Sequence, residues 1–238
     1  MIKKASTPFS AAIAAQREHG RVAVIPDIKC ISPKEGDLLR GRDPVSVAAS
    51  LVSFGAPVLS VVTERRHFGG SPELLQAIAE RTGVPVLRKD FIKDVQGLRD
   101  TVALGATAVL LIVASVDEAT LKMLYEQALS LGLEPLVEVH TAQEMALAKT
   151  LRPLLLGINN RDILNLELDS GSPERTQRLI SEKPDGCLLI SESGILSAED
   201  ARRAARAGAD AILVGTALWQ APDMALMYRQ LREAVCSA

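Results

Sequence analysis

The sequence predicts a closed (β/α)8 barrel of the phosphate-binding type, and three observations predict the barrel. Eight short apolar runs recur along the 238 residues, and most are followed by apolar residues at helical spacing. Leucine and β-branched residues fill the runs almost continuously, as in parallel strands covered on both faces. Glycines mark the helix-to-strand turns at Gly55, Gly105, Gly132 and Gly208. Eight such units in a chain of this length indicate a closed barrel.

The expected elements follow one another in a regular order. A short helical leader of about residues 1–20 precedes the first strand. The eight expected strands are residues 22–29, 58–62, 84–88, 108–113, 134–139, 154–159, 187–191 and 211–215. Good helix formers with apolar spacing, such as residues 72–79 and 119–125, predict the crossover helices. No linker or change of composition interrupts this order, so residues 1–238 are expected to form one domain.

An open doubly wound sheet is the alternative arrangement of the same units. A dinucleotide-binding sheet of that kind carries a G-x-G-x-x-G turn after its first strand. Residues 27–33 read Asp-Ile-Lys-Cys-Ile-Ser-Pro at that point. The closed barrel is therefore preferred.

Composition excludes several classes of function. The formal net charge is −2 and only 3% of residues are aromatic, which argues against a nucleic-acid partner. Three distant cysteines, Cys30, Cys187 and Cys236, form no metal-binding or disulfide pattern, which is typical of a reduced cytoplasmic protein. No apolar run reaches the roughly 18 residues that cross a membrane.

Ionisable and amide residues gather where the predicted strands end. They are Asp27, Lys29, Glu64, Lys89, Asp90, Glu138, His140, Asn159, Asn160, Arg161, Glu192 and Ser193. Each one alone is readily explained as a solvated or paired group. In a barrel, however, these ends meet at the rim that carries the active site.

Two loops at this rim are typical of a phosphate site. Residues 191–195 and 214–217 follow the last two strands and are rich in small residues, which allow backbone N–H groups to approach phosphate oxygens. The alternative is that both are merely tight turns. Lys29, Lys89 and Arg161 nearby indicate a polyanionic small molecule. An ammonium on Lys89 and a carboxylate on Glu138 could serve as general acid and base, or could form a structural ion pair.

Four motifs in order carry a resemblance to a known family. They are Lys-Asp-Phe at residues 89–91, Val-Glu-Val-His at 137–140, Ile-Asn-Asn-Arg at 158–161 and Ser-Glu-Ser-Gly at 191–194. From about residue 22 to residue 218 the chain resembles the indole-3-glycerol phosphate synthases of tryptophan biosynthesis. The resemblance implies a carboxy-lyase that closes 1-(2-carboxyphenylamino)-1-deoxyribulose 5-phosphate to an indole with loss of CO2 and water. It implies no metal and no organic cofactor, and it leaves other tryptophan-pathway enzymes as expected partners.

The resemblance also implies roles for catalytic residues. Lys89 would be the general acid of ring closure and Glu138 the general base of the dehydration. Asn159 would orient the reacting centre, and Glu192 would support the charge network. Asp27 occupies a position where the family has glutamate, one methylene longer.

The binding residues implied by the resemblance fall into three groups. Arg161 and Lys29 would hold the carboxylate of the substrate, and Phe68 and Phe91 would flank its aromatic ring. The phosphate would be bound by Ser32, Ser193, Gly194, Gly215 and Thr216.

The departures from the family pattern lie at the first strand, its loop and the leader. Besides Asp27, they are Cys30 and Ile31, where a basic residue and alanine are usual, and a leader shorter than the family's. Cys30 is interpreted as a packing residue rather than a nucleophile. Two further functions stay open: an isomerase acting on a phosphoribosyl-type substrate, and a barrel that binds a phosphorylated ligand without turnover.

Overall fold

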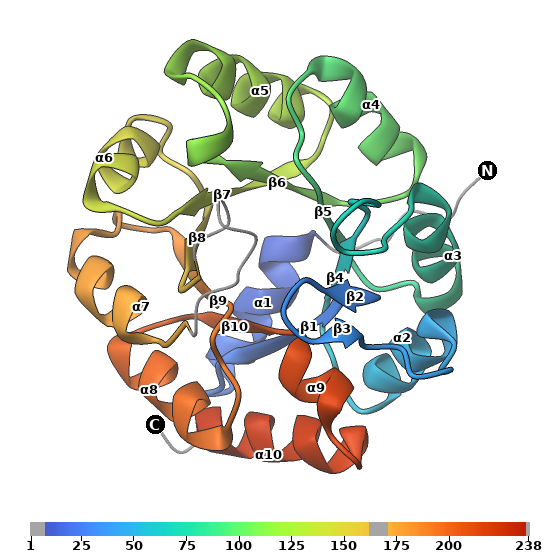
Figure 1. The fold of residues 1–238 in the computed structure, drawn as a ribbon. Coiled ribbons are helices and arrows are strands. Elements are labelled where there is room, and N and C mark those ends of the chain that lie inside the picture. Colours follow the sequence, from blue (N-terminus) through green and yellow to red (C-terminus); the bar gives the residue numbers. More distant parts are fainter. Residues whose placement is uncertain (1–7, 162–170, 237–238) are drawn as a thin grey trace.

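Eight parallel strands close into a barrel in the computed structural model, which describes residues 8–161 and 171–236 (Figure 1). They are β1 (Ala23–Ile28), β4 (Leu59–Val62), β5 (Val86–Lys89), β6 (Ala108–Ile112), β7 (Glu134–Val139), β8 (Leu155–Asn159), β9 (Leu188–Glu192) and β10 (Ala211–Val214). Each pairs with the next barrel strand in the chain, and β1 pairs with β10 to close the ring. The predicted (β/α)8 barrel is confirmed, and each strand lies within two residues of its expected bounds.

A ring of helices surrounds the strands in Figure 1. They are α2 (Pro44–Ser53), α3 (Pro72–Thr82), α4 (Val95–Ala103), α5 (Glu118–Ser130), α6 (Ala142–Thr150), α7 (Glu174–Leu179), α8 (Ala198–Ala207) and α10 (Met224–Cys236). Many of their starts are fixed by a polar side chain that accepts a backbone N–H bond, as Asp43 does for α2 and Ser197 for α8. No helix in the described ranges is long and apolar enough to span a membrane.

Shorter elements complete the connections between strands and helices. After β1 the chain forms a small antiparallel hairpin of β2 (Ile31–Ser32) and β3 (Gly36–Asp37). The 3-10 turn η1 (Val113–Ser115) follows β6, a second such turn, η2 (Ile180–Glu182), follows α7, and the short helix α9 (Thr216–Gln220) follows β10.

Strand alternation fills the barrel interior with apolar side chains. Ile25, Leu87 and Leu136 are fully buried there, because residues two apart on a strand face the same side. Helix α1 (Phe9–Glu18) packs against this interior through Phe9 and Ile13, also fully buried. The Ser10 hydroxyl donates to the Glu134 carboxylate at the amino end of β7. This end of the barrel is therefore filled by α1, which lies within the expected leader of about residues 1–20, while residues 1–7 of that leader lie outside the described residues.

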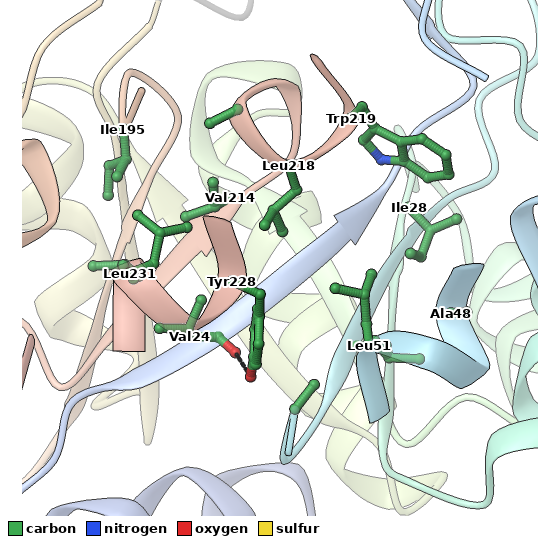
Figure 2. Close-up of a cluster of buried hydrophobic side chains, with 14 of the residues drawn as sticks. Val24, Ile28, Ala48, Leu51, Ile195, Val214, Leu218, Trp219, Tyr228 and Leu231 are labelled. Carbon is green, nitrogen blue, oxygen red and sulfur yellow. Dashed lines mark hydrogen bonds between the residues drawn. The ribbon is translucent and has the colours of Figure 1, made fainter. Parts of the chain in front are cut away.

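A second layer of core lies between the strands and the outer helices. Figure 2 shows Tyr228 and Leu231 of α10 and Leu51 of α2 packed around strand β1. The Tyr228 hydroxyl donates to the Val24 carbonyl at 3.3 Å. Trp219 of α9, 1% exposed, donates its indole N–H to the Asp27 carbonyl at 2.9 Å. Packing thus fixes the end of β1 where the polar residues begin.

Candidate active site

The alternation of side chains along the strands, which fills the barrel interior with apolar groups, also directs polar side chains inward at the carboxyl ends of the strands. Residues two apart on a strand face the same side, so the next inward-facing positions after the apolar layer are polar. They are Asp27, Lys89, Glu138, Asn159 and Glu192. All five side chains are buried, none in a residue more than 8% exposed. The rim site predicted from the strand ends is therefore a convergent cluster of charged and amide groups.

Two adjoining hollows open at this mouth and share Asp27, Lys29 and Lys89 in their walls. One encloses about 360 Å³ and is polar, with Arg161 and the loops after β9 and β10 completing its lining. Those loops contribute Ser193, Gly194, Gly215 and Thr216 among others.

The second hollow encloses about 320 Å³ and is mainly apolar. Its walls include Phe68, Phe91, Val62, Leu110 and Ile112. The Lys29 Nζ atom lies 5.5 Å from the centre of the Phe68 ring, within the range of a cation–π interaction. A ligand that fits both hollows needs an anionic part and a flat apolar part, with two lysines between them.

Glu138 and Glu192 are buried neighbours at the strand ends, and a glycine between them leaves room for both side chains. Gly157 of β8 is in register with Glu138, and a Cβ atom on Gly157 would lie 2.0 Å from Glu192 Oε1. Both carboxylates are 0% exposed and accept no hydrogen bond among the described residues. Burial, and then the nearby Glu138 carboxylate, raise the pKa of Glu192 well above its ordinary value, with Lys89 opposing them.

Asp27 is anchored at the wall that the two hollows share. The Ser60 hydroxyl of β4 donates to its Oδ1 atom at 2.7 Å. A Cβ atom on Gly215 would lie 3.3 Å from the Asp27 Cβ atom, so the absence of a side chain at Gly215 makes room for the aspartate. The strand-one departure therefore has its own supporting contacts in this chain.

The loop after β9 carries backbone strain at the wall of the polar hollow. Ser193 has φ 61° and Gly194 φ 68°, two successive residues in the left-handed region. Such a conformation is costly for a residue with a side chain and tends to occur at ligand sites. Gly194 also packs closely on the backbone of Gly171 and Ser172, where a Cβ atom would lie 3.0 Å away.

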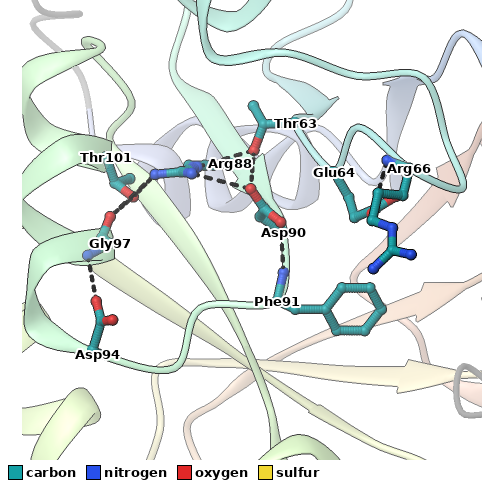
Figure 3. Close-up of polar contacts among 9 residues, drawn as sticks. All are labelled: Thr63, Glu64, Arg66, Arg88, Asp90, Phe91, Asp94, Gly97 and Thr101. Carbon is teal, nitrogen blue, oxygen red and sulfur yellow. Dashed lines mark hydrogen bonds and ion pairs between the residues drawn. The ribbon is translucent and has the colours of Figure 1, made fainter.

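Arg88, the residue before Lys89 on β5, extends toward Thr101 and Gly97 of helix α4 (Figure 3). The Arg88 guanidinium donates to Thr63 Oγ1 at 3.0 Å, to the Gly97 carbonyl at 3.1 Å and to Asp90 at 3.0 Å. Thr63 in turn donates to Asp90 at 2.6 Å. This network ties the ends of β4 and β5 to helix α4 on either side of the lysine.

Asn160 joins the ends of β8 and β9 in a similar way. Its Nδ2 atom donates to Ser191 Oγ and to the carbonyls of Glu192 and Ser193, at 3.0–3.1 Å. Arg175 of α7 donates to the carbonyls of Asn159 and Arg161, at 2.7 and 2.8 Å. These bonds set the position of Arg161 relative to the strained loop.

Comparison with known proteins decides the family. The family model described as indole-3-glycerol phosphate synthase matches residues 1–231. The chain belongs to the indole-3-glycerol phosphate synthase family. An indole-3-glycerol phosphate synthase of Pyrococcus furiosus is 41% identical over 220 residues, covering 92% of this chain and 96% of the relative. Another, from Kineococcus radiotolerans, is 44% identical over 206 residues, covering 87% and 74%.

Solved structures extend the comparison to the fold. The 3-hexulose-6-phosphate synthase of Salmonella typhimurium superposes with a TM-score of 0.72 at 16% identity, covering 90% of this chain and 99% of that one. At this identity the likeness shows the shared barrel architecture alone.

The structure brings together most of the residues that the sequence predicted for an indole-3-glycerol phosphate synthase site. Ten of them line the two hollows: Asp27, Lys29, Phe68, Lys89, Phe91, Arg161, Ser193, Gly194, Gly215 and Thr216. Glu138, Asn159 and Glu192 lie buried at the strand ends beside the lining residues. Ser32 is buried in hairpin strand β2, lines neither hollow, and accepts a bond from the Glu35 N–H at 3.4 Å.

Several residues of the site carried no clear signal in the sequence. Leu110 and Ile112 line the apolar hollow from inward positions that strand alternation could have indicated. Arg175 lies on a helix far along the chain, and nothing in its surroundings marks it.

Cys30 is buried, and burial raises the pKa of its thiol, with Asp37 adding to the effect, which suits packing rather than nucleophilic chemistry. Over residues 8–161 and 171–236, no group of three or more His, Cys, Asp or Glu could hold a metal ion.

Proposed function

We propose that this protein converts 1-(2-carboxyphenylamino)-1-deoxyribulose 5-phosphate to indole-3-glycerol phosphate, with release of CO2 and water. One observation carries the proposal: the polar and the apolar hollow share Lys29 and Lys89. The substrate has a phosphate at one end, an aromatic ring at the other and its reacting carbonyl between them. Membership of the indole-3-glycerol phosphate synthase family supports the same reaction.

The phosphate belongs in the polar hollow. Ser193, Gly194, Gly215 and Thr216 offer hydroxyl and backbone groups there, and small residues let the phosphate oxygens come close. Arg161 and Lys29 supply the positive charge that the substrate carboxylate needs, and a guanidinium suits a carboxylate through two parallel bonds. Ser32 is assigned to the phosphate on resemblance alone.

The aromatic ring belongs in the apolar hollow, flanked by Phe68 and Phe91. Aromatic pairs prefer offset or edge-on contacts that also exclude water. Ring placement there brings the ring carbon that bears the carboxylate towards the carbonyl carbon of the sugar chain. Such positioning can supply several kcal/mol of the barrier by itself, on the order of 7–11 kcal/mol in favourable cases.

Ring closure needs an acid. The ring carbon attacks the carbonyl carbon while the Lys89 ammonium gives a proton to the carbonyl oxygen, which becomes a hydroxyl. The C–C bond to the carboxylate then breaks, CO2 leaves, and its electron pair restores the aromatic ring. Asn159 orients this centre through its buried amide, whose Nδ2 atom has no hydrogen-bond partner among the described residues.

Dehydration needs a base. Glu138 takes a proton from the methylene carbon next to the ring nitrogen, and the indole double bond forms as the new hydroxyl departs. The Lys89 ammonium, which has regained a proton from water, gives it to the departing hydroxyl, so that water is released. Both oxygens of the buried Glu138 carboxylate are without a hydrogen-bond partner among the described residues, so each can accept the proton. Glu192 and Asp27 set the charge around this step, with Asp27 held by Ser60.

The proposal is tested by following indole fluorescence with this substrate. Lys89→Ala should lower kcat by about 10²-fold or more, the usual contribution of a general acid. Lys122→Ala, at an exposed position on α5, is the matched control and should leave kcat unchanged. A folded wild-type protein that binds the substrate without forming indole would refute the proposal.

A further inference from the structure

His140 connects the buried base to the edge of the barrel. It follows Glu138 by two residues, so its side chain continues the inward face of β7. Its Nε2 atom lies 3.5 Å from Glu138 Oε1, and its Nδ1 atom lies 3.1 Å from Glu144 Oε2. The exposed fractions of the side chains rise from 0% at Glu138 to 9% at His140 and 18% at Glu144.

Glu144 fixes the orientation of the imidazole. The Glu144 Oε2 atom also accepts the backbone N–H of His140 at 2.8 Å. The backbone N–H of Glu144 donates to the hydroxyl of Thr141 at the start of α6. Burial raises the pKa of Glu144, but the bonds from His140 outweigh it and lower the pKa overall, so the carboxylate is charged. A charged acceptor at Nδ1 keeps the proton there and leaves the Nε2 lone pair facing Glu138.

We propose that His140 passes the proton gained by Glu138 from the substrate to solvent, with Glu144 holding the ring in the tautomer that can accept it. The inference rests on the proposed function, since it gives Glu138 the role of base. The Nε2 atom of His140 is buried and has no hydrogen-bond partner among the described residues. At 3.5 Å a small movement brings it within bonding distance, as happens when catalytic groups close on substrate.

The proton balance of the relay is simple. The protonated Glu138 gives its O–H proton to Nε2 and becomes a carboxylate again, ready for another turnover. His140 becomes an imidazolium between two carboxylates, and its Nδ1 proton then leaves through Glu144 to water. After the product leaves, water removes the remaining Nε2 proton while Glu144 returns a proton to Nδ1, which restores the starting tautomer with one net proton released. No oxidant, metal or second substrate is required.

The charged groups around the relay come from several elements. Glu144 of α6 faces the imidazole, and no titratable residue occurs in η1, which packs against β7 and α6. The other strand ends also carry charged groups, which are Glu192 on β9, Lys89 on β5, Asp27 on β1, Arg161 after β8, Lys29 after β1, Glu64 after β4 and Asp90 after β5. Glu192 is the neighbour that competes with His140 for the proton of Glu138.

The test compares pH profiles of kcat for the wild type, His140→Gln and His140→Asn. We expect kcat to fall about 10-fold, less than for loss of a direct acid or base. We expect KM to change less than two-fold, and the solvent isotope effect on kcat to rise as proton exit becomes slow. Imidazole in the buffer should restore part of kcat in His140→Ala. Glu144→Gln should lower kcat without preventing α6 from starting, because Gln also serves at that position of a capping box.

His19→Gln, at an exposed position after α1, is the control and should match the wild type. Melting temperatures of all variants separate loss of proton transfer from loss of folding. An active wild type whose His140 variants keep its kcat, pH profile and isotope effect would overturn the relay while leaving the proposed function intact. A loss of kcat without any change in pH profile, isotope effect or imidazole response would also overturn it.

Discussion

Two carboxylates enclosed in one small space dominate the site at the scale of single residues. Glu138 and Glu192 come from strands that are not adjacent, and Gly157 on the strand between them leaves room for their contact. Their positions at strand ends were predictable from the sequence, because each follows an apolar run. Their contact was not, since it depends on a missing side chain and on the stagger of neighbouring strands.

The raised pKa of Glu192 makes stability depend on pH. Below the ordinary glutamate pKa of 4.5, Glu192 is protonated in both the folded and the unfolded chain, so its titration does not change the free energy of unfolding. As pH rises, the unfolded chain releases this proton first, so stability is lost until pH passes the higher pKa of the folded state. Glu192→Gln removes the titration and should therefore stabilise the fold at pH 8, by about 1–3 kcal/mol.

Urea unfolding at pH 4 and pH 8 checks this. The stability difference between Glu192→Gln and the wild type should be small at the lower pH and in favour of the variant at the higher one. The exposed Glu80→Gln should show no such difference. Equal effects at both pH values would contradict the assignment of the shift to burial and Glu138.

At the scale of elements, the site depends on networks that join neighbouring strand ends. Arg88 donates to Thr63 after β4, to Asp90 after β5 and to Gly97 and Thr101 of α4, while the adjacent Lys89 lines the hollows at the mouth. An ammonium cannot replace a guanidinium that bonds in several directions. Arg88→Lys should therefore destabilise the fold by about 1–3 kcal/mol. We also expect kcat/KM to fall about 10-fold or more through displacement of Lys89.

Activity and urea titrations of Arg88→Lys measure both effects, with the exposed Arg81→Lys on α3 as the matched control. Unchanged kcat/KM in a destabilised Arg88→Lys protein would show that the network supports the barrel but does not position the lysine.

Strands and helix starts could be predicted from the sequence, whereas the hydrogen-bond networks that join the strand ends could not. The strands were predictable to within two residues, because a buried parallel strand is a short apolar run bounded by turns. Helix starts such as Asp43 and Ser197 carry ordinary capping signals. The bonds of Asn160 and Arg175 go mainly to backbone carbonyls and hydroxyls of distant elements, so no residue pattern marks them.

At the scale of the whole molecule, stability and chemistry are separated along the barrel axis. Helix α1 fills one end through Phe9 and Ile13, whereas the hollows open at the other. Phe9→Ala should cost about 3–5 kcal/mol, as for other buried phenylalanines. Its kcat should stay within two-fold of the wild type at a temperature where both proteins are folded. Urea unfolding and indole formation measure the two quantities, with the exposed Glu18→Ala on the same helix as control.

A fall in kcat that matches the fall in stability at that temperature would show that the two ends are coupled. The sequence predicted both the leader helix and the rim site, but it did not place Phe9 against the barrel interior, because packing of one helix end is a tertiary contact.

The closure of the barrel has a consequence for how the chain folds. Seven of the eight pairings between described barrel strands join neighbours along the chain, and the eighth joins residues 23–26 to residues 211–214. Loop-closure entropy grows with the length of chain enclosed, and folding slows as contacts become more distant in sequence. The seam between β1 and β10 is thus the pairing with the largest entropic cost. Arg17 of α1 bonds Asp210 beside it and Tyr228 of α10 bonds Val24 within it, so both flanking helices secure the seam that forms with most difficulty.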